Sequence, residues 1–188
     1  PKRSGEVGVR STEQSVGIID YIIVRKNRKT LMKKIGIIGA MELEVETLKA
    51  HMTTTNITTK ANMEFHEGTL NGTPVVIVRS GVGKVNAALC VQILADLFEV
   101  TAIINTGVAG SLDAKIDIGD IVVSTDVCQH DMDVTVMGYQ LGEVPQLGTL
   151  SFPADEKMAA LAKSVCEKVN TEIKVFSGRI VSGDQIIC

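Results

Sequence analysis

The positions of apolar and polar residues change character repeatedly along the chain. Short apolar runs of strand length alternate with longer stretches whose apolar residues recur at helical spacing. The runs that predict buried strands are residues 34–39, 101–105, 120–124 and 173–181. The stretches that predict amphipathic helices are residues 42–51, 84–98 and 155–169. Strands that alternate with helices indicate an α/β domain with a largely parallel sheet.

A different pattern lies between the first two predicted helices. Residues 63–70 and 74–79 are two strand-like runs separated by Asn71-Gly72. Because this dipeptide favours the tight turn that joins two antiparallel strands, it predicts a β-hairpin. The fold class that we expect is therefore α/β with helices on a mixed, mostly parallel central sheet.

Residues 1–31 differ in composition from the rest. They are basic and polar around one apolar patch, and Met32 then begins a pattern typical of a natural protein start. We interpret residues 1–31 as a basic leader or N-terminal extension, and residues 32–188 as the domain itself. The alternative is an additional strand at residues 17–24, docked on an edge of the sheet. A native protein that begins at Pro1 would refute the leader interpretation.

Composition limits the partners. The 188 residues suffice for one domain with a real core, and 45% of them are apolar and 22% charged. A net charge of −3 and an aromatic content of 3% with no Trp argue against nucleic acid and against an anionic membrane surface. Residues 16–24, the nearest candidate for a membrane helix, are interrupted by Asp20 and are shorter than the roughly 20 residues that such a helix needs.

The four cysteines form no C-x-x-C pair, and the three histidines are scattered. A structural zinc site is therefore not expected, and reduced thiols in a cytoplasmic protein are the default interpretation.

Two glycine-containing segments resemble nucleotide-binding loops at first sight. The segment "SGVGKV", residues 80–85, has Val78 and Val85 where a P-loop requires Gly and a hydroxyl residue. The segment "GIIGAM", residues 36–41, lacks the G-x-G-x-x-G spacing of a dinucleotide-binding turn. Both interpretations are therefore rejected.

Small residues follow three of the predicted strands, at residues 39–41, 80–83 and 106–111, and a fourth such segment, "VSGDQII", lies at 181–187. In open α/β sheets, ligands bind beyond the carboxyl ends of the strands, where small residues allow the backbone to approach closely. We therefore expect a pocket at this edge of the sheet. The alternative is that each segment is a tight turn that merely needs glycine.

Three glutamates follow the first glycine turn. On a helix that begins near Glu42, Glu42 and Glu46 are most simply solvated residues, whereas Glu44 lies at the margin of the face formed by Met41, Val45 and Leu48. Partial burial disfavours an ionised carboxyl group and a helix N-terminus favours it, a balance that suits a general base. Glu44 is thus the candidate base, although glutamates at the margin of a helix face are common.

A second polar cluster contains His130, Asp131 and Asp133. It has the residue types of a proton shuttle or a metal site, but a hydrogen-bonded loop histidine is the more frequent outcome. Residues 137–150 contain Gly and Pro and lack periodicity, so we expect a loop there, at a possible interface.

Five segments taken together resemble the bacterial 5′-methylthioadenosine/S-adenosylhomocysteine nucleosidases, which are members of the nucleoside phosphorylase superfamily. They are "MKKIGIIGAMELEVETL", "SGVGKVNAAL", "INTGVAGSLDAKIDIGDIVVS", "HDMDVTVMGY" and "VSGDQII", in matching order between Met32 and Ile187. The resemblance implies the superfamily's three-layer sandwich. It also implies cofactor-free and metal-free hydrolysis of the N-glycosidic bond of both nucleosides, in the cytoplasm, as part of methionine salvage.

The resemblance also assigns residues. Glu44 matches the glutamate that activates water, and an anion beneath the sugar would stabilise positive charge at C1′ in the transition state. The substrate-binding residues that it implies are Met41, Val108, Gly110, Ile186, Ile187, Met137 and Pro145. Ile186 and Ile187 would line the adenine, whereas Met137 and Pro145 would close the 5′-thio pocket of a neighbouring subunit in a homodimer.

The chain departs from the family pattern in two ways. Val108 replaces a serine that many members have near the ribose. The family also continues after the position of Cys188 with a strand, a motif that grips the ribose hydroxyls and an aspartate that protonates adenine. Without that acid we expect this polypeptide to be inactive or nearly so, because a general acid contributes on the order of a hundredfold or more.

Two other functions remain open. A phosphate-dependent nucleoside phosphorylase would share the architecture but requires cations for phosphate, and Arg79 is one candidate. A ligand-binding or structural fragment without turnover is the non-enzymatic alternative.

Overall fold

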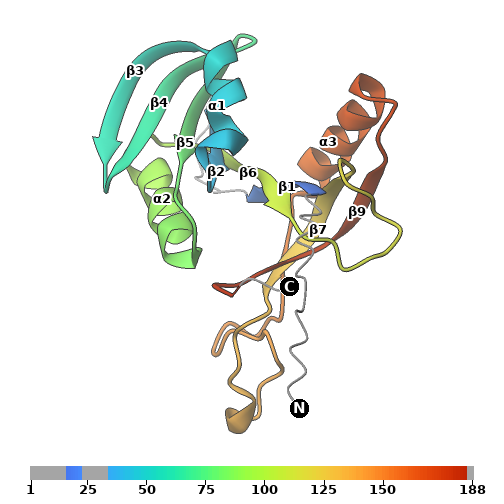
Figure 1. The fold of residues 1–188 in the computed structure, drawn as a ribbon. Coiled ribbons are helices and arrows are strands. Elements are labelled where there is room, and N and C mark those ends of the chain that lie inside the picture. The colour runs from blue at the N-terminus through green and yellow to red at the C-terminus, as the bar shows by residue number, and fades with distance from the viewer. Residues whose placement is uncertain (1–15, 23–33, 186–188) are drawn as a thin grey trace, which may run out of the picture.

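One mixed β-sheet runs through the computed structural model, which describes residues 16–22 and 34–185 (Figure 1). Among these residues the sheet has nine strands. Eight of them follow the order β3-β4-β5-β2-β6-β1-β7-β8, and the ninth, β9, pairs with β7 outside this order. The strands are β1 (Val16–Ile22), β2 (Ile35–Gly39), β3 (Thr53–Lys60), β4 (Met63–Leu70), β5 (Thr73–Arg79), β6 (Ala102–Ala109), β7 (Ile121–Gln129), β8 (Phe152–Pro153) and β9 (Val175–Ser182). The α/β fold class with a mixed sheet is confirmed, and four of the eight described strand pairings are parallel.

Helices cover both faces of this sheet, which makes the domain three layers thick. The helices are α1 (Glu42–His51), α2 (Lys84–Asp96) and α3 (Glu156–Val169). Alternation along β2 separates the two cores: Ile38 packs with Cys90 and Leu94 of α2, whereas Ile37 packs with Val45 of α1. Ile104 of β6 contacts both the α1 core and the α3 core. Helices α1 and α3 therefore share one face, and α2 covers the other.

The hairpin and the three helices lie where the sequence predicts them. Asn71 and Gly72 connect β4 to β5 with φ angles of 48° and 78°. Two successive positive φ angles are the requirement of the turn that this dipeptide favours. None of the described helices is both long enough and apolar enough to span a membrane.

Two strands extend further than the sequence predicts. β6 continues through the glycine-containing segment to Ala109, and β7 continues to Gln129. Residues 106–109 were expected to form a loop, and this expectation is wrong. Their backbone pairs with β1 from Thr106↔Ile19 to Ala109↔Val16, so that a neighbouring strand keeps the segment extended.

Strand β1 comes from the segment interpreted as a leader. The alternative strand at residues 17–24 is present as Val16–Ile22, but its expected place at a sheet edge is wrong. β1 lies between β6, with which it is antiparallel, and β7, with which it is parallel. It joins two parts of the sheet that have no other pairing among the described residues. Whether residues 1–31 are a leader remains untested.

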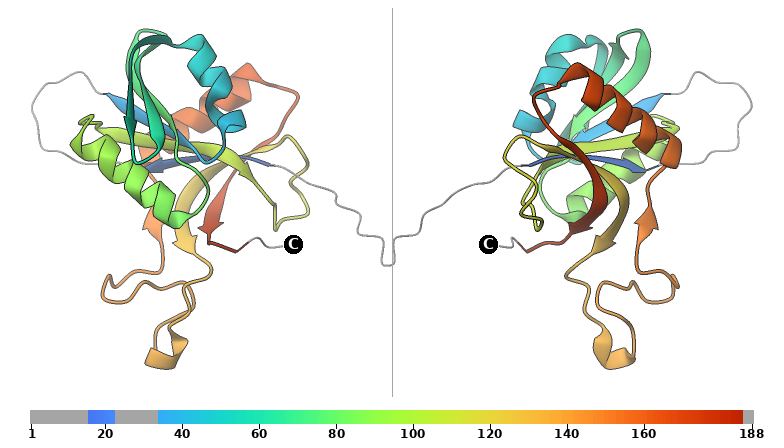
Figure 2. Two further views of the ribbon diagram at one scale, coloured as in Figure 1. Left: turned by 60° about the vertical axis from the view of Figure 1, so that its left-hand side comes forward. Right: turned by 90° about the vertical axis from the view of Figure 1, so that its right-hand side faces the viewer.

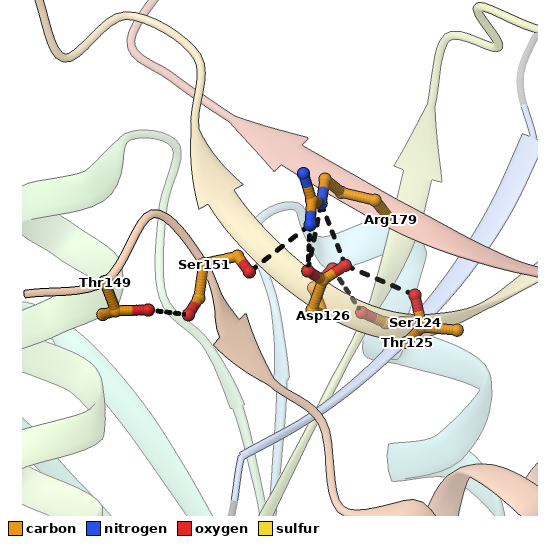
Figure 3. Close-up of polar contacts among 6 residues, drawn as sticks. All are labelled: Ser124, Thr125, Asp126, Thr149, Ser151 and Arg179. Carbon is orange, nitrogen blue, oxygen red and sulfur yellow. Dashed lines mark hydrogen bonds and ion pairs between the residues drawn. The ribbon is translucent and has the colours of Figure 1, made fainter. Parts of the chain in front are cut away.

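A long excursion, residues 130–151, leaves the sheet after β7 and returns at β8 (Figures 1 and 2). A cluster of polar side chains lies where the excursion rejoins the sheet (Figure 3). Arg179 of β9 donates to both carboxylate oxygens of Asp126 on β7, at 2.6 to 3.0 Å, and its Nη2 lies 3.4 Å from the Ser151 hydroxyl. The cluster thus ties β7, β9 and the end of the excursion together.

Candidate active site

The carboxyl ends of three neighbouring strands bring their glycine-containing segments together. β2 is parallel to β5 on one side and to β6 on the other. After these strands end, the backbone N–H of Ser80 donates to the carbonyl of Gly39 at 2.9 Å. The expected convergence of residues 39–41, 80–83 and 106–111 is confirmed, with the correction that the third segment is a strand up to Ala109.

Glu44 connects the first and third of these segments. Its Oε2 accepts a 2.8 Å hydrogen bond from the backbone N–H of Met41, the residue that precedes α1. Its Oε1 accepts a 3.0 Å hydrogen bond from the backbone N–H of Val108 in β6. The first contact is one half of a capping box, in which a glutamate in the first turn satisfies a free donor at the helix start. The second reaches a different element and fixes the carboxylate over the end of β6.

Two glycines leave the room that this carboxylate occupies. A Cβ atom on Gly107 would lie 2.6 Å from Oε1 of Glu44. A Cβ atom on Gly39 would lie 2.9 Å from Cβ of Glu44 and 2.7 Å from Cγ1 of Val45. Such distances are closer than van der Waals contact allows. A side chain at Gly39 would therefore push against the start of α1, and a side chain at Gly107 would displace the Glu44 carboxylate.

Glu42 and Arg79 occupy the outer side of the same region. Glu42 is exposed, as expected, and it also forms two ion pairs. Its Oε1 accepts a 2.7 Å hydrogen bond from Nζ of Lys49, and its Oε2 lies 3.8 Å from Nε of Arg79. Glu46 is exposed, as expected. The positive charge of Arg79 is therefore already opposed by a carboxylate.

The fourth segment, which follows β9, contacts the start of α2 and the end of β7 through charged side chains. Asp184 accepts a 2.8 Å hydrogen bond from the backbone N–H of Lys84, the first residue of α2. The Nζ of Lys84 lies 2.6 Å from Oδ1 of Asp131, and Oδ2 of Asp131 accepts from the backbone N–H of Asp184 at 2.8 Å. The hydrogen bond from Lys84 is the largest of the causes that lower the pKa of Asp131 to about 2.

The His130 cluster does not form a metal site in the described residues. Asp131 is bound by Lys84 and Asp184, and Asp133 binds the backbone and hydroxyl of Thr135. No group of three or more His, Cys, Asp or Glu side chains in residues 34–185 is placed to hold a metal ion. The backbone N–H of His130 donates to Ser182, which adds a further link between β7 and β9.

The structure brings some of the predicted site residues together. Met41, Glu44 and Val108 meet through the two hydrogen bonds described above. Gly110 follows β6 directly, and open space surrounds the position that its Cβ would take. Ile186 and Ile187 lie outside the described residues.

Met137 and Pro145 lie elsewhere. Both belong to the excursion, and Met137, in the short 3₁₀ helix Thr135–Met137, is 69% exposed. Within residues 34–185 neither is hydrogen-bonded to the cluster around Glu44. Their assignment to a pocket thus remains a prediction.

An open hollow of about 670 Å³ lies in the loop after β6, apart from Glu44. Its lining consists of Ser111, Leu112, Asp113, Ala114, Ile116, Asp117 and Ile118. All of these residues come from one loop, and the hollow includes none of the groups that hold Glu44.

Sequence reasoning missed two contributions. Gly107 was one glycine among several, and Val108 was named as a substrate-binding residue and for the hydroxyl that it lacks, but not as a donor to Glu44. Their contributions are an absent Cβ and a backbone N–H, neither of which is a side-chain group. Neither leaves a local pattern in the sequence, because each acts only through the way Glu44 lies over β6.

The carboxylate of Glu44 can accept further hydrogen bonds beyond the two that hold it. An ionised carboxylate offers about four lone-pair positions, and two backbone donors engage one on each oxygen. The remaining positions are available to accept a hydrogen bond from water while the carboxylate is held still. Such a group can orient water, take up a proton and stabilise developing positive charge.

Comparisons with known proteins show which sequences and folds this chain resembles. A family model for the phosphorylase superfamily matches residues 34–188. The 5′-methylthioadenosine/S-adenosylhomocysteine nucleosidase of Colwellia psychrerythraea is 46% identical over 154 residues, which are 80% of this chain and 63% of that protein. The chain therefore spans just under two thirds of the length of this relative.

Solved structures give the same picture. The crystal structure of a Colwellia psychrerythraea nucleosidase of this name in complex with adenine has a TM-score of 0.78 and 45% identity, with 82% of this chain and 64% of that chain covered. The Neisseria meningitidis nucleosidase in complex with methylthio-immucillin-A has a TM-score of 0.77 and 38% identity, with 81% and 65% covered.

Proposed function

The chain belongs to the phosphorylase superfamily, and from this membership we propose that it acts as a 5′-methylthioadenosine/S-adenosylhomocysteine nucleosidase. The reaction is hydrolysis of the N-glycosidic bond of these nucleosides to adenine and a 5-thio-substituted ribose. Relatives at 44 to 46% identity that bear this name support the proposal.

The observation that carries the proposal is the position of Glu44. Its carboxylate is fixed by the N–H groups of Met41 and Val108 beyond the carboxyl ends of β2 and β6. Ligands of open α/β sheets bind at such strand ends. A nucleoside bound there would place its sugar beside a fixed anion.

The proposed chemistry balances with water as the second reactant. As the C1′–N9 bond breaks, its electron pair leaves with adenine and positive charge develops on the sugar. Glu44 stabilises that charge and accepts a proton from the water that attacks C1′. Adenine takes up a proton from solvent and Glu44 returns its proton to solvent, so that overall water supplies a hydroxyl group to C1′ and a hydrogen to adenine. Neither a cofactor nor a metal ion takes part in this scheme.

Phosphorolysis is the competing reaction, and the charges near the site disfavour it. A phosphate nucleophile would require cations, and residues 39–44, 79–84 and 106–111 contain only Arg79 and Lys84. Arg79 faces Glu42, and Lys84 is bound to Asp131. With both cations engaged by carboxylates, water is the nucleophile that fits these segments better.

The proposal includes an assembly and a location. We propose a cytoplasmic homodimer in which Met137 and Pro145 of one subunit close the 5′-thio pocket of the other. The exposed apolar side chains of the excursion support this arrangement, since Val136 is 95% and Met137 69% exposed. The thio-ribose product keeps the sulfur of the substrate, so that a sulfur-salvage reaction, as in methionine salvage, would consume it.

A single-turnover assay tests the proposed function. The protein, in excess over 5′-methylthioadenosine, should release free adenine without added phosphate, at the low rate that the sequence predicts for these 188 residues, and the rate should not change when phosphate is added. Direct titration with adenine gives an independent measurement of the site. Absence of both adenine binding and adenine release would overturn the proposal, whereas phosphate-dependent release would favour a phosphorylase.

A further inference from the structure

Glu42 lies between two cations at the start of α1. Its Oε1 accepts a 2.7 Å hydrogen bond from Nζ of Lys49, and its Oε2 lies 3.8 Å from Nε of Arg79. Within residues 34–185, neither cation forms an ion pair with another carboxylate. One side chain therefore neutralises both positive charges.

The two cations differ in their access to solvent. The Lys49 side chain is only 13% exposed, whereas the Arg79 side chain is 53% exposed. A mostly buried ammonium group needs a nearby anion, because it has lost most of the water that would solvate its charge. The two cations thus form an anion-binding arrangement, and the carboxylate of Glu42 is the anion that it holds.

This arrangement borders the candidate base. Arg79 of β5 is in register with Gly39 of the parallel strand β2, so the two residues project to the same face of the sheet. A Cβ atom on Gly39 would lie 2.9 Å from Cβ of Glu44, which shows that this face is the one that α1 covers. Glu42 and Glu44 belong to the same first turn of that helix. An anion bound by Arg79 would therefore lie beside the turn that carries the candidate base.

The two glutamates of this turn have different partners. Glu44 is held by the backbone N–H groups of Met41 and Val108, and it forms no ion pair among the described residues. Glu42 binds the two cations instead. The cations are thus kept from the base, and they are not left free to bind an anion from solution.

We propose that Glu42 is a specificity-determining residue that excludes inorganic phosphate from the site. A phosphate ion that approached Lys49 and Arg79 would meet a negative charge where it would otherwise find two cations, and such juxtaposition of like charges rejects a ligand. Water then remains as the nucleophile. This inference rests on the proposed function, because it gives the reason why this member of the phosphorylase superfamily would use water rather than phosphate.

Titration of the full chain with inorganic phosphate, at constant ionic strength, tests this role. Glu42→Gln keeps the size of the side chain and removes its charge, and it should bind phosphate about tenfold or more tightly than the wild type by calorimetry. Its melting temperature should also rise more with added phosphate than that of the wild type. Glu46→Gln is the matched control: it changes the net charge equally, at an exposed position of the same helix, and should behave like the wild type.

Three further variants separate the local charge from general stability. Glu42→Asp keeps the negative charge and should exclude phosphate like the wild type. Glu42→Gln/Arg79→Gln removes the more accessible cation and should lose most of the gained affinity. Glu42→Gln/Lys49→Met removes the mostly buried charge that the single variant leaves without its partner. This variant guards against a folding defect, and it should still bind phosphate more tightly than the wild type through Arg79.

The outcomes keep the two proposals apart. If the wild-type chain neither binds nor releases adenine, the proposed function fails, and the titrations still decide whether Glu42 excludes phosphate. If the wild type binds adenine but neither Glu42→Gln nor Glu42→Gln/Lys49→Met binds phosphate more tightly than it does, the function stands and the role of Glu42 is overturned. An equal gain in Glu46→Gln would also overturn it, because it would indicate a general effect of net charge.

Discussion

The Oε1 atom of Glu44 accepts a 3.0 Å hydrogen bond from the backbone N–H of Val108, although the two residues are 64 positions apart in the sequence. Together with the N–H of Met41 at 2.8 Å, this contact uses one lone pair on each carboxylate oxygen. Because both donors are backbone groups, replacement of the Val108 or Met41 side chain leaves them in place. Replacement of Glu44 removes the acceptor that both donors share, and the first prediction concerns that residue.

Glu44→Gln should reduce both catalysis and stability. An amide has one acceptor oxygen and cannot satisfy both backbone donors, so its NH₂ group would face the N–H of Met41 or Val108. We expect the free energy of unfolding to fall by about 1 to 2 kcal/mol. Loss of the base should lower single-turnover adenine release by about a hundredfold or more. Glu46→Gln, at an exposed position of the same helix, is the control and should change neither quantity.

Gly107→Ala should test the position of the Glu44 carboxylate without removing its charge. The added methyl group would lie 2.6 Å from Oε1 of Glu44, so the carboxylate would have to leave the Val108 donor. Adenine release should fall by about tenfold or more, since small displacements of reacting groups are costly. In Gly178→Ala the new atom would lie 3.9 Å from Val122, and this control should behave like the wild type. An active Gly107→Ala protein would show that the contact with Val108 is dispensable.

Sequence periodicity predicted the elements whose structure depends on nearby residues. The helix 42–51 was predicted to the residue, and the Asn71-Gly72 hairpin has the expected backbone angles. β3, which is mostly exposed and rich in Thr, was missed because it lacks an alternating apolar face. The extension of β6 to Ala109 was missed for another reason: it depends on pairing with β1, a partner about 90 residues away that no local pattern reveals.

The same distinction applies to the site. Glu44 was found because its helical position can be read from the spacing of Met41, Val45 and Leu48. The ion pair of Glu42 with Lys49 and Arg79 was not, since it depends on how α1 lies across β5. Backbone donors such as the N–H of Val108 leave no signature in a sequence at all.

The pH dependence of stability should reveal the Asp126–Arg179 pair. Hydrogen bonds from Arg179 are the largest cause that holds the pKa of Asp126 below its usual range. A carboxyl group whose pKa is lower in the folded state stabilises the fold above its unfolded pKa, near 3.9, and loses this contribution as the pH falls through the folded value. The melting temperature of the wild type should therefore fall as the pH is lowered below about 4. The melting temperature of Asp126→Asn should fall less steeply over the same range.

The experiment compares the difference in stability between the wild type and Asp126→Asn at two pH values. Asp126→Asn should be less stable than the wild type at pH 7, and the gap should narrow as the pH approaches 3. Asp96→Asn is the control, because within residues 34–185 the Asp96 side chain is hydrogen-bonded to Gln92 of its own helix and to no other element. A gap between wild type and Asp126→Asn that stays constant from pH 7 to pH 3 would contradict the assigned cause.

Removal of residues 1–31 distinguishes the leader interpretation from the observed strand. β1 pairs with β6 over seven residues and with β7 over three, and it alone connects these two strands among the described residues. Its loss would leave the N–H and C=O groups of two neighbouring strands unpaired inside a sheet, which costs stability and exposes strand edges to association. We expect the 32–188 chain to melt at a lower temperature and to aggregate in size-exclusion chromatography. Deletion of residues 1–15 alone, which retains the strand, should preserve both the melting temperature and the elution volume. A 32–188 chain that is monodisperse and melts at the same temperature as the wild type would show that β1 is dispensable and would support the interpretation of this segment as a leader.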